Sequence, residues 1–315
     1  MLAYVGSRLV QAVPVLLLDS IVIFGFIRLI PGDPALALAG QNATPEQVEA
    51  LRERFGLDQP LTTQYVTWIG QALRGDLGFS YISDRPVRDL VSQRIPATLQ
   101  LALGSILVMV LVGAPLGVFT AVRPHSPGAH LVSVISAVAL ATPTFWLGLL
   151  LILYFSVSRK VLPASGYVTF TEDPLEAIKH LLLPALTLGA YGTAVLIRFL
   201  NASLTDALKA DYIRVAYAKG LRERAVVMRH ALKVALPPVI TILAIQFGQL
   251  LGGAVVTESV FGWPGLGRLI LDAISNRDYL VVQSTMLLFV TIFVLLNILA
   301  DVGYALLNPR IRLGR

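Results

Sequence analysis

The stretch SLTDALKADYIRVAYAKGLRERAVVMRHALKVALPPVI, residues 203–240, is the only long basic, amphipathic segment in a chain that is otherwise mostly apolar. Its seven Lys or Arg side chains outnumber its three acids. Four apolar side chains recur at helical spacing and predict an apolar side on a short helix. They are Leu204, Leu208, Tyr212 and Val215. Gly220 is predicted to end that helix, because glycine adopts left-handed backbone angles without a steric penalty. A second helical run follows and meets Leu236-Pro237-Pro238, where an apolar span begins.

The composition is that of a membrane protein. Of the 315 residues, 56% are hydrophobic and 14% are charged, whereas soluble domains carry about 25% charged residues. The net charge of +6 indicates basic cytoplasmic loops near anionic lipid, and nucleic acid is the weaker interpretation. The chain has no cysteine, P-loop, nucleophile elbow or HExxH motif, so we expect neither an enzyme nor ATP hydrolysis by this chain. His125 and His130 share a loop without a third ligand, which favours a solvated loop over a metal site.

Apolar runs predict six transmembrane helices, each near the roughly 20 residues that cross a bilayer. They cover residues 9–30, 97–122, 131–157, 181–200, 235–256 and 281–307. Pro143 lies inside the third run and is predicted to bend it. The basic residues of the short loops place both termini in the cytoplasm. Ala37-Leu38-Ala39 resembles a signal-peptidase site, but the preceding apolar run is too long for a signal peptide, so we expect no cleavage.

The polar segment 31–96 is predicted to be a small helical cap outside the membrane; a plain connecting segment is the alternative. Thr44-Pro45-Glu46-Gln47 is a strong helix start, with Thr44 as the N-cap and Gln47 three residues later. A second amphipathic run, 61–73, carries Tyr65 and Trp68. Such helices lie on a bilayer or cover a pore mouth.

Polar residues inside the predicted spans are the candidates for a translocation path. Four of them share one face of the fifth span: Gln246, Gln249, Gly253 and Thr257. A polar stripe within lipid must face protein or water. It therefore lines a path or forms hydrogen bonds to a neighbouring helix, and the glycines favour the path. Asp19, in the middle of the first span, is either functional or a buried hydrogen-bonding group.

Several motifs spread over nearly the whole chain are typical of one family. They are LIPGDPALALAG (29–40), FGLDQPLTTQYVTWIGQALRGDLGFSY (55–81), RPVRDLVSQRIPATLQLAL (85–103), ESVFGWPGLGRLILDAISNRDYLVVQ (258–283) and NPRIR (308–312). Together they resemble the dipeptide, oligopeptide and nickel import family of ABC-transporter permeases. Residues 214–220, Arg-Val-Ala-Tyr-Ala-Lys-Gly, resemble the cytoplasmic EAA loop of these permeases, in which a short coupling helix docks onto the ATPase. The resemblance implies ATPase coupling through Asp211, Arg214, Ala216, Lys219, Gly220 and Leu221.

The resemblance also implies an architecture and an assembly. The expected fold is an all-α integral membrane protein with six transmembrane helices, of the type I ABC-importer permease kind, with an extracytoplasmic helical insertion between the first and second spans. The expected partners are a second homologous permease chain, two ABC ATPase subunits, an extracytoplasmic solute-binding protein and membrane lipid. ATP and Mg would be bound by the ATPases, so this chain needs no cofactor. The location would be the inner membrane of a prokaryote.

Four regions follow from these expectations. Residues 1–30 hold the N-terminus and first transmembrane helix, 31–96 the extracytoplasmic insertion, 97–307 the transmembrane core with the coupling loop 201–234, and 308–315 a cytoplasmic tail. The predicted function is import of di- and oligopeptides by alternating access, with glutathione, nickel or another small solute as alternatives. A rival is an ion-coupled carrier, with Asp19 and Asp301 as its intramembrane charges.

Overall fold

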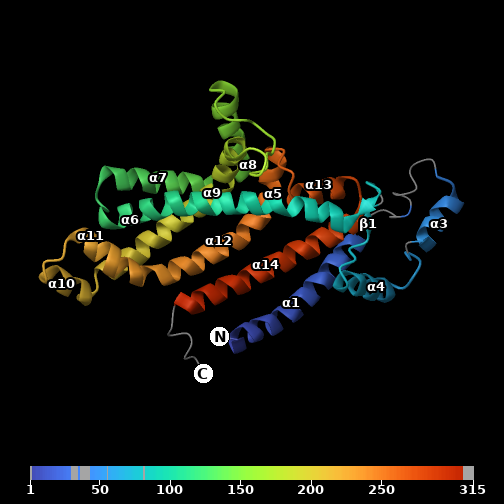
Figure 1. Ribbon diagram of the computed structural model, residues 1–315, viewed down its shortest axis with the longest axis horizontal. Helices are drawn as coiled ribbons and strands as arrows, with labels where there is room; N and C mark the ends of the chain where they lie inside the picture. The colour runs from blue at the N-terminus through green and yellow to red at the C-terminus, as the bar shows by residue number, and fades with distance from the viewer. Residues whose placement is uncertain (1, 30–34, 36–42, 55, 81, 308–315) are drawn as a thin grey trace. The chain divides into compact units, whose positions relative to one another are not determined.

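A computed structural model describes residues 2–29, 35, 43–54, 56–80 and 82–307, and almost all of its regular structure is helical (Figure 1). The possible cleavage site at 37–39 and the tail at 308–315 lie outside the described residues. In the first third of the chain the elements are α1 (Leu2–Leu29), α3 (Pro45–Arg54), α4 (Leu61–Leu73), β1 (Phe79–Ser80), β2 (Arg85–Pro86) and α5 (Val87–Val108). The middle holds η1 (Met109–Gly113), α6 (Ala114–Val122), α7 (Pro127–Ala141), α8 (Thr144–Leu151), η2 (Ile152–Ser158) and α9 (Pro174–Leu208). The last third holds α10 (Asp211–Ala218), α11 (Glu223–Ala225), η3 (Val226–Ala231), α12 (Leu232–Val260), α13 (Leu266–Ser275) and α14 (Tyr279–Leu307), where η marks π-helix.

The described helices supply four or five candidate spans, against six predicted. Four are long and apolar enough to cross a membrane: Gly6–Arg28, Val87–Val122, Pro174–Leu208 and Glu223–Leu250. Within the residues searched, α14 contributes a shorter apolar stretch, Tyr279–Leu295. The helix that carries the second span begins at Val87, ahead of the predicted Ala97, because Pro96 lies inside α5 and does not end the helix. One departure from the all-α prediction is the antiparallel pair β1–β2, which aligns Phe79 with Pro86.

The predicted third span is broken. The helix axis bends by 113° between α7 and the helix formed by α8 and η2, so the proline bend is confirmed, but the two pieces form either one broken span or a re-entrant loop. Thr142 has an extended backbone, as expected of a residue before proline. Its hydroxyl donates a 2.7 Å hydrogen bond to the Val138 carbonyl. The Val138 carbonyl near the end of α7 therefore accepts a hydrogen bond although the helix is broken.

The chain divides into two compact units. The α9 unit comprises Leu99–Trp263 and the described residues 295–307; the α1 unit comprises the described residues of Leu2–Thr98 and Pro264–Val294. The boundaries fall within α5, between α12 and α13, and within α14.

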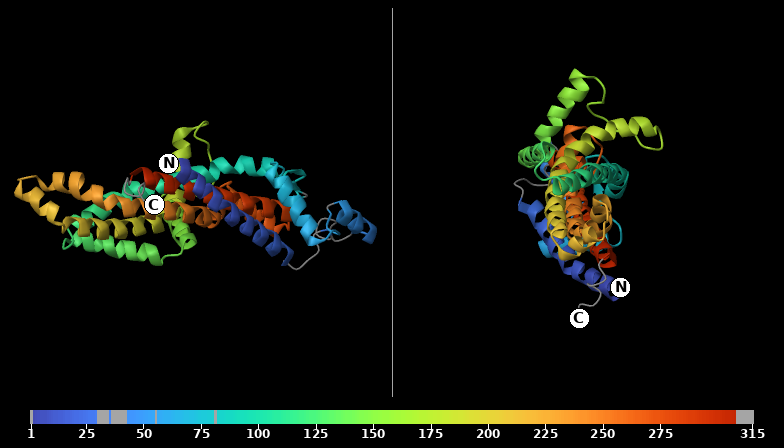
Figure 2. Two further views of the ribbon diagram at one scale, coloured as in Figure 1. Left: turned by 90° about the horizontal axis from the view of Figure 1, so that it is seen from below. Right: turned by 90° about the vertical axis from the view of Figure 1, so that its left-hand side faces the viewer.

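Helix α9 is the centre of its unit and packs against α6, α7, α8, η1 and α12. Asp173 caps it by accepting hydrogen bonds from the backbone N–H groups of Leu175 and Glu176, so it begins outside the predicted span 181–200. Glycines permit close approach of its neighbours. A Cβ added to Gly104, Gly113 or Gly117 would lie 3.0 Å from Leu181, Leu196 or Leu200 of α9. Figures 1 and 2 show α10 and α11 at one end of the bundle formed by α6, α7, α9 and α12.

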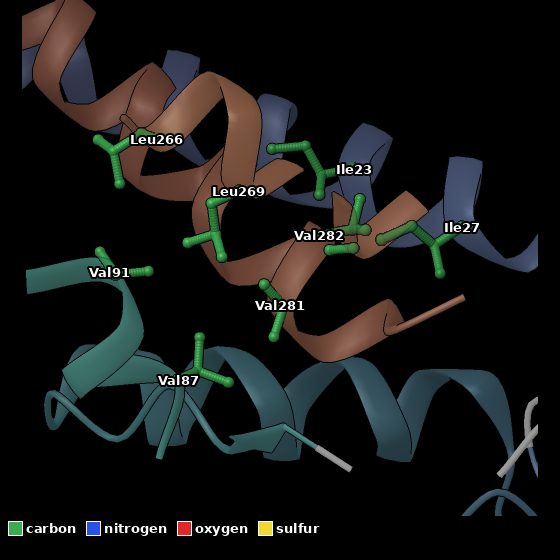
Figure 3. Packing of buried hydrophobic residues seen from close by; sticks show 9 residues of the cluster. Ile23, Ile27, Val87, Val91, Leu266, Leu269, Val281 and Val282 are labelled. Atoms are coloured by element: carbon green, nitrogen blue, oxygen red, sulfur yellow. The ribbon is translucent and has the colours of Figure 1, made fainter. Parts of the chain in front are cut away.

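The α1 unit is built around one apolar cluster. Figure 3 shows its side chains converging from four helices. They are Ile23 and Ile27 of α1, Val87 and Val91 of α5, Leu266, Leu269 and Ala273 of α13, and Val281 and Val282 of α14. The Thr98 hydroxyl accepts a 2.8 Å hydrogen bond from the Leu266 backbone N–H and so fixes the start of α13 against α5.

Candidate functional site

The coupling loop contains a separate short helix, α10, at the end of α9. Lys209 and Ala210 turn the chain, and α10 begins at Asp211. The acid in the first turn suits the positive end of the helix dipole. Its carboxylate lies 3.5 Å from the Arg214 guanidinium, and both side chains are largely exposed. An exposed pair of this kind contributes little to stability and leaves both charges accessible to a partner.

The four apolar residues that were predicted to share one side of a short helix lie on two helices. Leu204 and Leu208 belong to the end of α9, while Tyr212 and Val215 are 43% and 54% exposed. Ile213 and Ala216 are buried in their place. They join an apolar cluster with Leu204, Ala207, Val226, Val227 and Ala231. The turn at Lys209 separates the two helices, so the helical spacing assumed across residues 204–215 does not apply.

Gly220 ends α10 as predicted. Its φ of +74° is left-handed, and its N–H donates to the Tyr217 carbonyl at 2.9 Å. The Leu221 N–H donates to the Ala216 carbonyl at 3.3 Å, which completes a Schellman cap. Among the residues that the structure describes, no heavy atom lies within 4 Å of a Cβ added to Gly220. Glycine is therefore required by backbone conformation and not by space.

The exposed side of α10 is both apolar and basic. Tyr212, Val215, Tyr217 and Leu221 are at least 39% exposed, and Arg214 and Lys219 lie on the same short segment. Anchored by Ile213 and Ala216, this surface is held in a fixed orientation while remaining uncovered by the described chain. Exposed apolar patches rimmed by charge are typical of protein interfaces.

The loop joins the next long helix without a break. After α11, the π-helix η3 runs directly into α12, which contains Pro237 and Pro238. The Ser203 hydroxyl donates a 3.0 Å hydrogen bond to the Ala235 carbonyl and so links α9 to α12. The second predicted helical run and the fifth span therefore form one continuous helical segment that passes through Leu236-Pro237-Pro238. The coupling loop is thus tied to both long helices.

The residues of the polar stripe on α12 differ in how far they are buried. Gln246 is 6% exposed and Thr257 is 1% exposed, whereas Gln249 is exposed. An added Cβ on Gly192 of α9 would lie 3.3 Å from the Gln246 amide nitrogen, and one on Gly253 would lie 3.1 Å from Leu188. Gln246 and Gly253 thus face α9, while Gln249 lies on an open flank.

The helices of segment 31–96 form where predicted, but α4 is partly covered by α1. Thr44 and Gln47 form the reciprocal capping box of α3, with bonds of 3.0 and 3.4 Å. The Tyr65 hydroxyl lies 2.8 Å from that of Ser20, and the Trp68 ring stacks on Phe24 at 6.1 Å. The aromatic side chains of α4 therefore pack on α1.

A buried polar network in the α1 unit was not predicted. Asp278 is 3% exposed; its carboxylate accepts hydrogen bonds from the Ser80 hydroxyl and from the Val281 N–H at 3.5 Å. Burial raises the pKa of the Asp278 carboxyl, and these hydrogen bonds oppose the rise. The sequence signal was an aspartate close before the sixth predicted span, and in the structure it directly precedes α14 in the position of an N-cap.

Comparisons with known proteins cover both halves of the chain. Residues 113–313 match the family described as binding-protein-dependent transport system inner membrane component, and residues 1–102 match its N-terminal counterpart. The chain is 43% identical over 312 residues to proteins named glutathione transport system permease protein GsiC from Escherichia coli O6:H1, Escherichia coli K12 and Shigella dysenteriae. Each match covers 99% of both chains.

The fold also matches a solved transporter. A chain of the inward-facing MetNI methionine ABC transporter aligns with a TM-score of 0.57 and 18% identity, covering 70% of this chain and 96% of that one. A second crystal form gives a TM-score of 0.55 at 19% identity. At this identity the likeness shows the fold alone.

Proposed function

Since this chain belongs to the binding-protein-dependent transport system inner membrane components, and so is a multi-pass permease subunit of a bacterial ABC importer, we propose that its system imports glutathione and similar short peptides. The observation that carries the proposal is 43% identity, across 99% of both chains, to permeases named for glutathione. These relatives favour glutathione over the broader prediction of di- and oligopeptides. The family membership removes support for an ion-coupled carrier.

The family implies ATPase and binding-protein partners, because its members work in binding-protein-dependent systems. We propose in addition a second, homologous permease, with the path between the two chains and two ATPases that bind ATP and Mg. The permease itself does not catalyse hydrolysis. Its contribution is mechanical: movement of the ATPases is transmitted through α10 into α9 and α12.

The proposed ATPase contact is the exposed side of α10 and its cap. Asp211, Arg214 and Lys219 supply charge, and Leu221 supplies apolar surface. Ala216 and Gly220 act differently, since Ala216 is buried beneath the helix and Gly220 sets the direction in which the chain leaves it. Because α10 is anchored by buried side chains and tied to two long helices, a push on it reaches both.

The proposed topology keeps six spans with both termini in the cytoplasm. It counts α7 and α8 as one broken span and α14 as the sixth. Under this topology segment 31–96 and α13 lie outside, where a binding protein delivers solute. The four regions 1–30, 31–96, 97–307 and 308–315 remain our proposed division. The solute path is proposed to include Gln249 on the open flank, with Gln246, Gly253 and Thr257 forming the wall behind it.

The test is uptake by the reconstituted importer. Proteoliposomes containing this chain, its partner permease and ATPases, with the binding protein outside, should accumulate labelled glutathione when ATP is enclosed. Labelled dialanine and nickel ions serve as competing solutes. Uptake of dialanine or nickel without glutathione would reject the proposed solute, and uptake without ATPases would reject the proposed mechanism.

A further inference from the structure

A cavity of about 470 Å³ lies within the α1 unit. Its walls come from α1, α4, the start of α14 and the turns around residues 56 and 78. Among the lining side chains are Phe24, Arg28, Gln64, Trp68, Tyr279 and Gln283. The volume is within the roughly 300–1,000 Å³ typical of small-molecule sites. None of the residues proposed above to couple to the ATPase or to line the path contributes to it.

Three polar atoms on the cavity wall are buried without a hydrogen-bond partner in the described part of the chain. They are the Trp68 Nε1, the Tyr279 hydroxyl and the Gln283 Nε2. Trp68 is 7% exposed and Gln283 is 4% exposed. Buried polar groups in folded proteins are almost always paired, because an unpaired one loses its water without compensation. Three such groups around one cavity indicate a ligand that supplies acceptor oxygens.

The charges around the cavity indicate the kind of oxygen. Arg28, which is partly buried, supplies a cationic group on the cavity wall, where it donates to the Gln64 side-chain carbonyl and lies 5.1 Å from the centre of the Phe24 ring. Glu53 and Asp76 also line the cavity, and both are exposed. Partly buried donors beside a guanidinium suit a carboxylate, while carboxylates at the exposed rim suit an ammonium group. Apolar walls come from Phe24, the Trp68 ring and Phe79.

We propose that this cavity binds a free short peptide by its terminal carboxylate, with Trp68, Tyr279 and Gln283 donating to the carboxylate. Arg28 compensates its charge, and the acids at the rim face the amino terminus. The ligand class and the outward orientation of the cavity rest on the proposed function. Under that function the cavity is a docking site on the outer side, separate from the path, where solute is held between delivery and entry.

The experiment measures peptide binding to the complete transporter in lipid nanodiscs by isothermal titration calorimetry. The probes are trialanine and trialanine amide, which differ at the carboxylate alone. The free acid is expected to bind at least about tenfold more tightly, because a hydrogen bond to a charged group contributes about 1.5–3 kcal/mol. Equal binding of acid and amide, or no binding of either, would overturn the proposal.

Two conservative variants assign the binding to the cavity. Trp68→Phe and Tyr279→Phe each remove one donor and keep an aromatic ring, so each is expected to weaken acid binding about tenfold and amide binding little. Trp146→Phe is the matched control, because Trp146 is half-exposed on α8 and does not line the cavity. Chromatography and thermal unfolding confirm that each variant folds. A folded Tyr279→Phe protein with unchanged acid binding would place the peptide elsewhere.

A measurement of glutathione uptake distinguishes failure of the cavity site from failure of the proposed function. The cavity holds a peptide site if Trp68→Phe and Tyr279→Phe lose binding of trialanine while the control Trp146→Phe retains glutathione uptake. Wild-type uptake of glutathione with equal acid and amide binding would overturn the cavity site and leave the proposed function intact. Carboxylate-dependent binding without any ATP-driven uptake would overturn the proposed function and keep the cavity site.

Discussion

The Ser80 hydroxyl donates to the buried carboxylate of Asp278 and joins residues that are 198 positions apart in the chain. Ser80 ends β1, and Asp278 lies between α13 and α14. The Ser83 hydroxyl donates to Ser80 at 2.7 Å, so Ser80 is oriented from both sides. The network therefore fixes the β1–β2 turn against the start of α14.

The Asp278 network predicts a pH-dependent stability. Burial raises the pKa of this carboxyl above its usual 3.8, so the folded state holds the proton more tightly than the unfolded chain. Its stabilising contribution is complete below the unfolded pKa and is lost as pH rises through the folded-state pKa. Asp278→Asn should therefore gain in thermal midpoint relative to wild type as pH rises. Ser80→Ala should enlarge the loss of stability and extend it to higher pH than in wild type, because it removes a hydrogen bond that lowers the pKa of Asp278. If the thermal midpoints of all three proteins in detergent changed in parallel with pH, the raised pKa of Asp278 would be contradicted.

Gly220 should be sensitive to any side chain. Alanine at a φ of +74° costs about 1–2 kcal/mol, and relief of that strain would redirect the chain leaving α10. Gly220→Ala should thus lower uptake per ATP hydrolysed by the reconstituted importer. Gly75→Ala is the matched control, since Gly75 has a φ of +83°, an equally open Cβ position and the same pair of capping bonds after α4. Equal losses in both variants would show general destabilisation and not uncoupling.

The two glutamines of α12 should differ in access to water. The chain has no cysteine, so a single introduced cysteine reports without background. Gln249→Cys should react rapidly with a polar maleimide in the assembled transporter, while Gln246→Cys, which replaces a 6% exposed residue, should react slowly. Solute should protect Gln249→Cys if this position lines the path. Protection of neither cysteine, with both unreactive, would leave helix packing as the role of both positions.

The contact between α9 and α5 should be destabilised by a single added methyl group. A Cβ on Gly189 would lie 2.9 Å from the Ser105 carbonyl oxygen, which belongs to the backbone and cannot rotate away. Gly189→Ala should therefore destabilise the protein by about 1–3 kcal/mol. Gly252→Ala is the control, because nothing lies within 4 Å of its Cβ and alanine favours the helix by up to about 1 kcal/mol. Thermal unfolding in detergent compares them, and an unchanged Gly189→Ala would contradict the close packing.

Local patterns in the chain were sufficient for the class, several element boundaries and the family. Long apolar runs can satisfy their backbone groups in lipid only as helices, so composition determined a helical membrane protein. The Thr44–Gln47 capping box and the Gly220 cap depend on neighbouring residues alone, and both formed as predicted. The motifs spread along the chain resemble the permease family, and the comparisons confirm that membership.

Contacts between distant segments decided the rest. Which side of α10 is buried depends on the turn at Lys209 and on Val226 and Val227, which follow the helix in sequence. Gln246 and Gln249 are alike in sequence, and only the position of α9 distinguishes the buried one. Ser80 and Asp278 meet although 198 positions separate them in the chain, and Trp68 lines the same cavity as Tyr279 and Gln283. Helical periodicity predicts which residues share one face of a helix. Which segment packs on that face is decided by the packing of the whole folded chain.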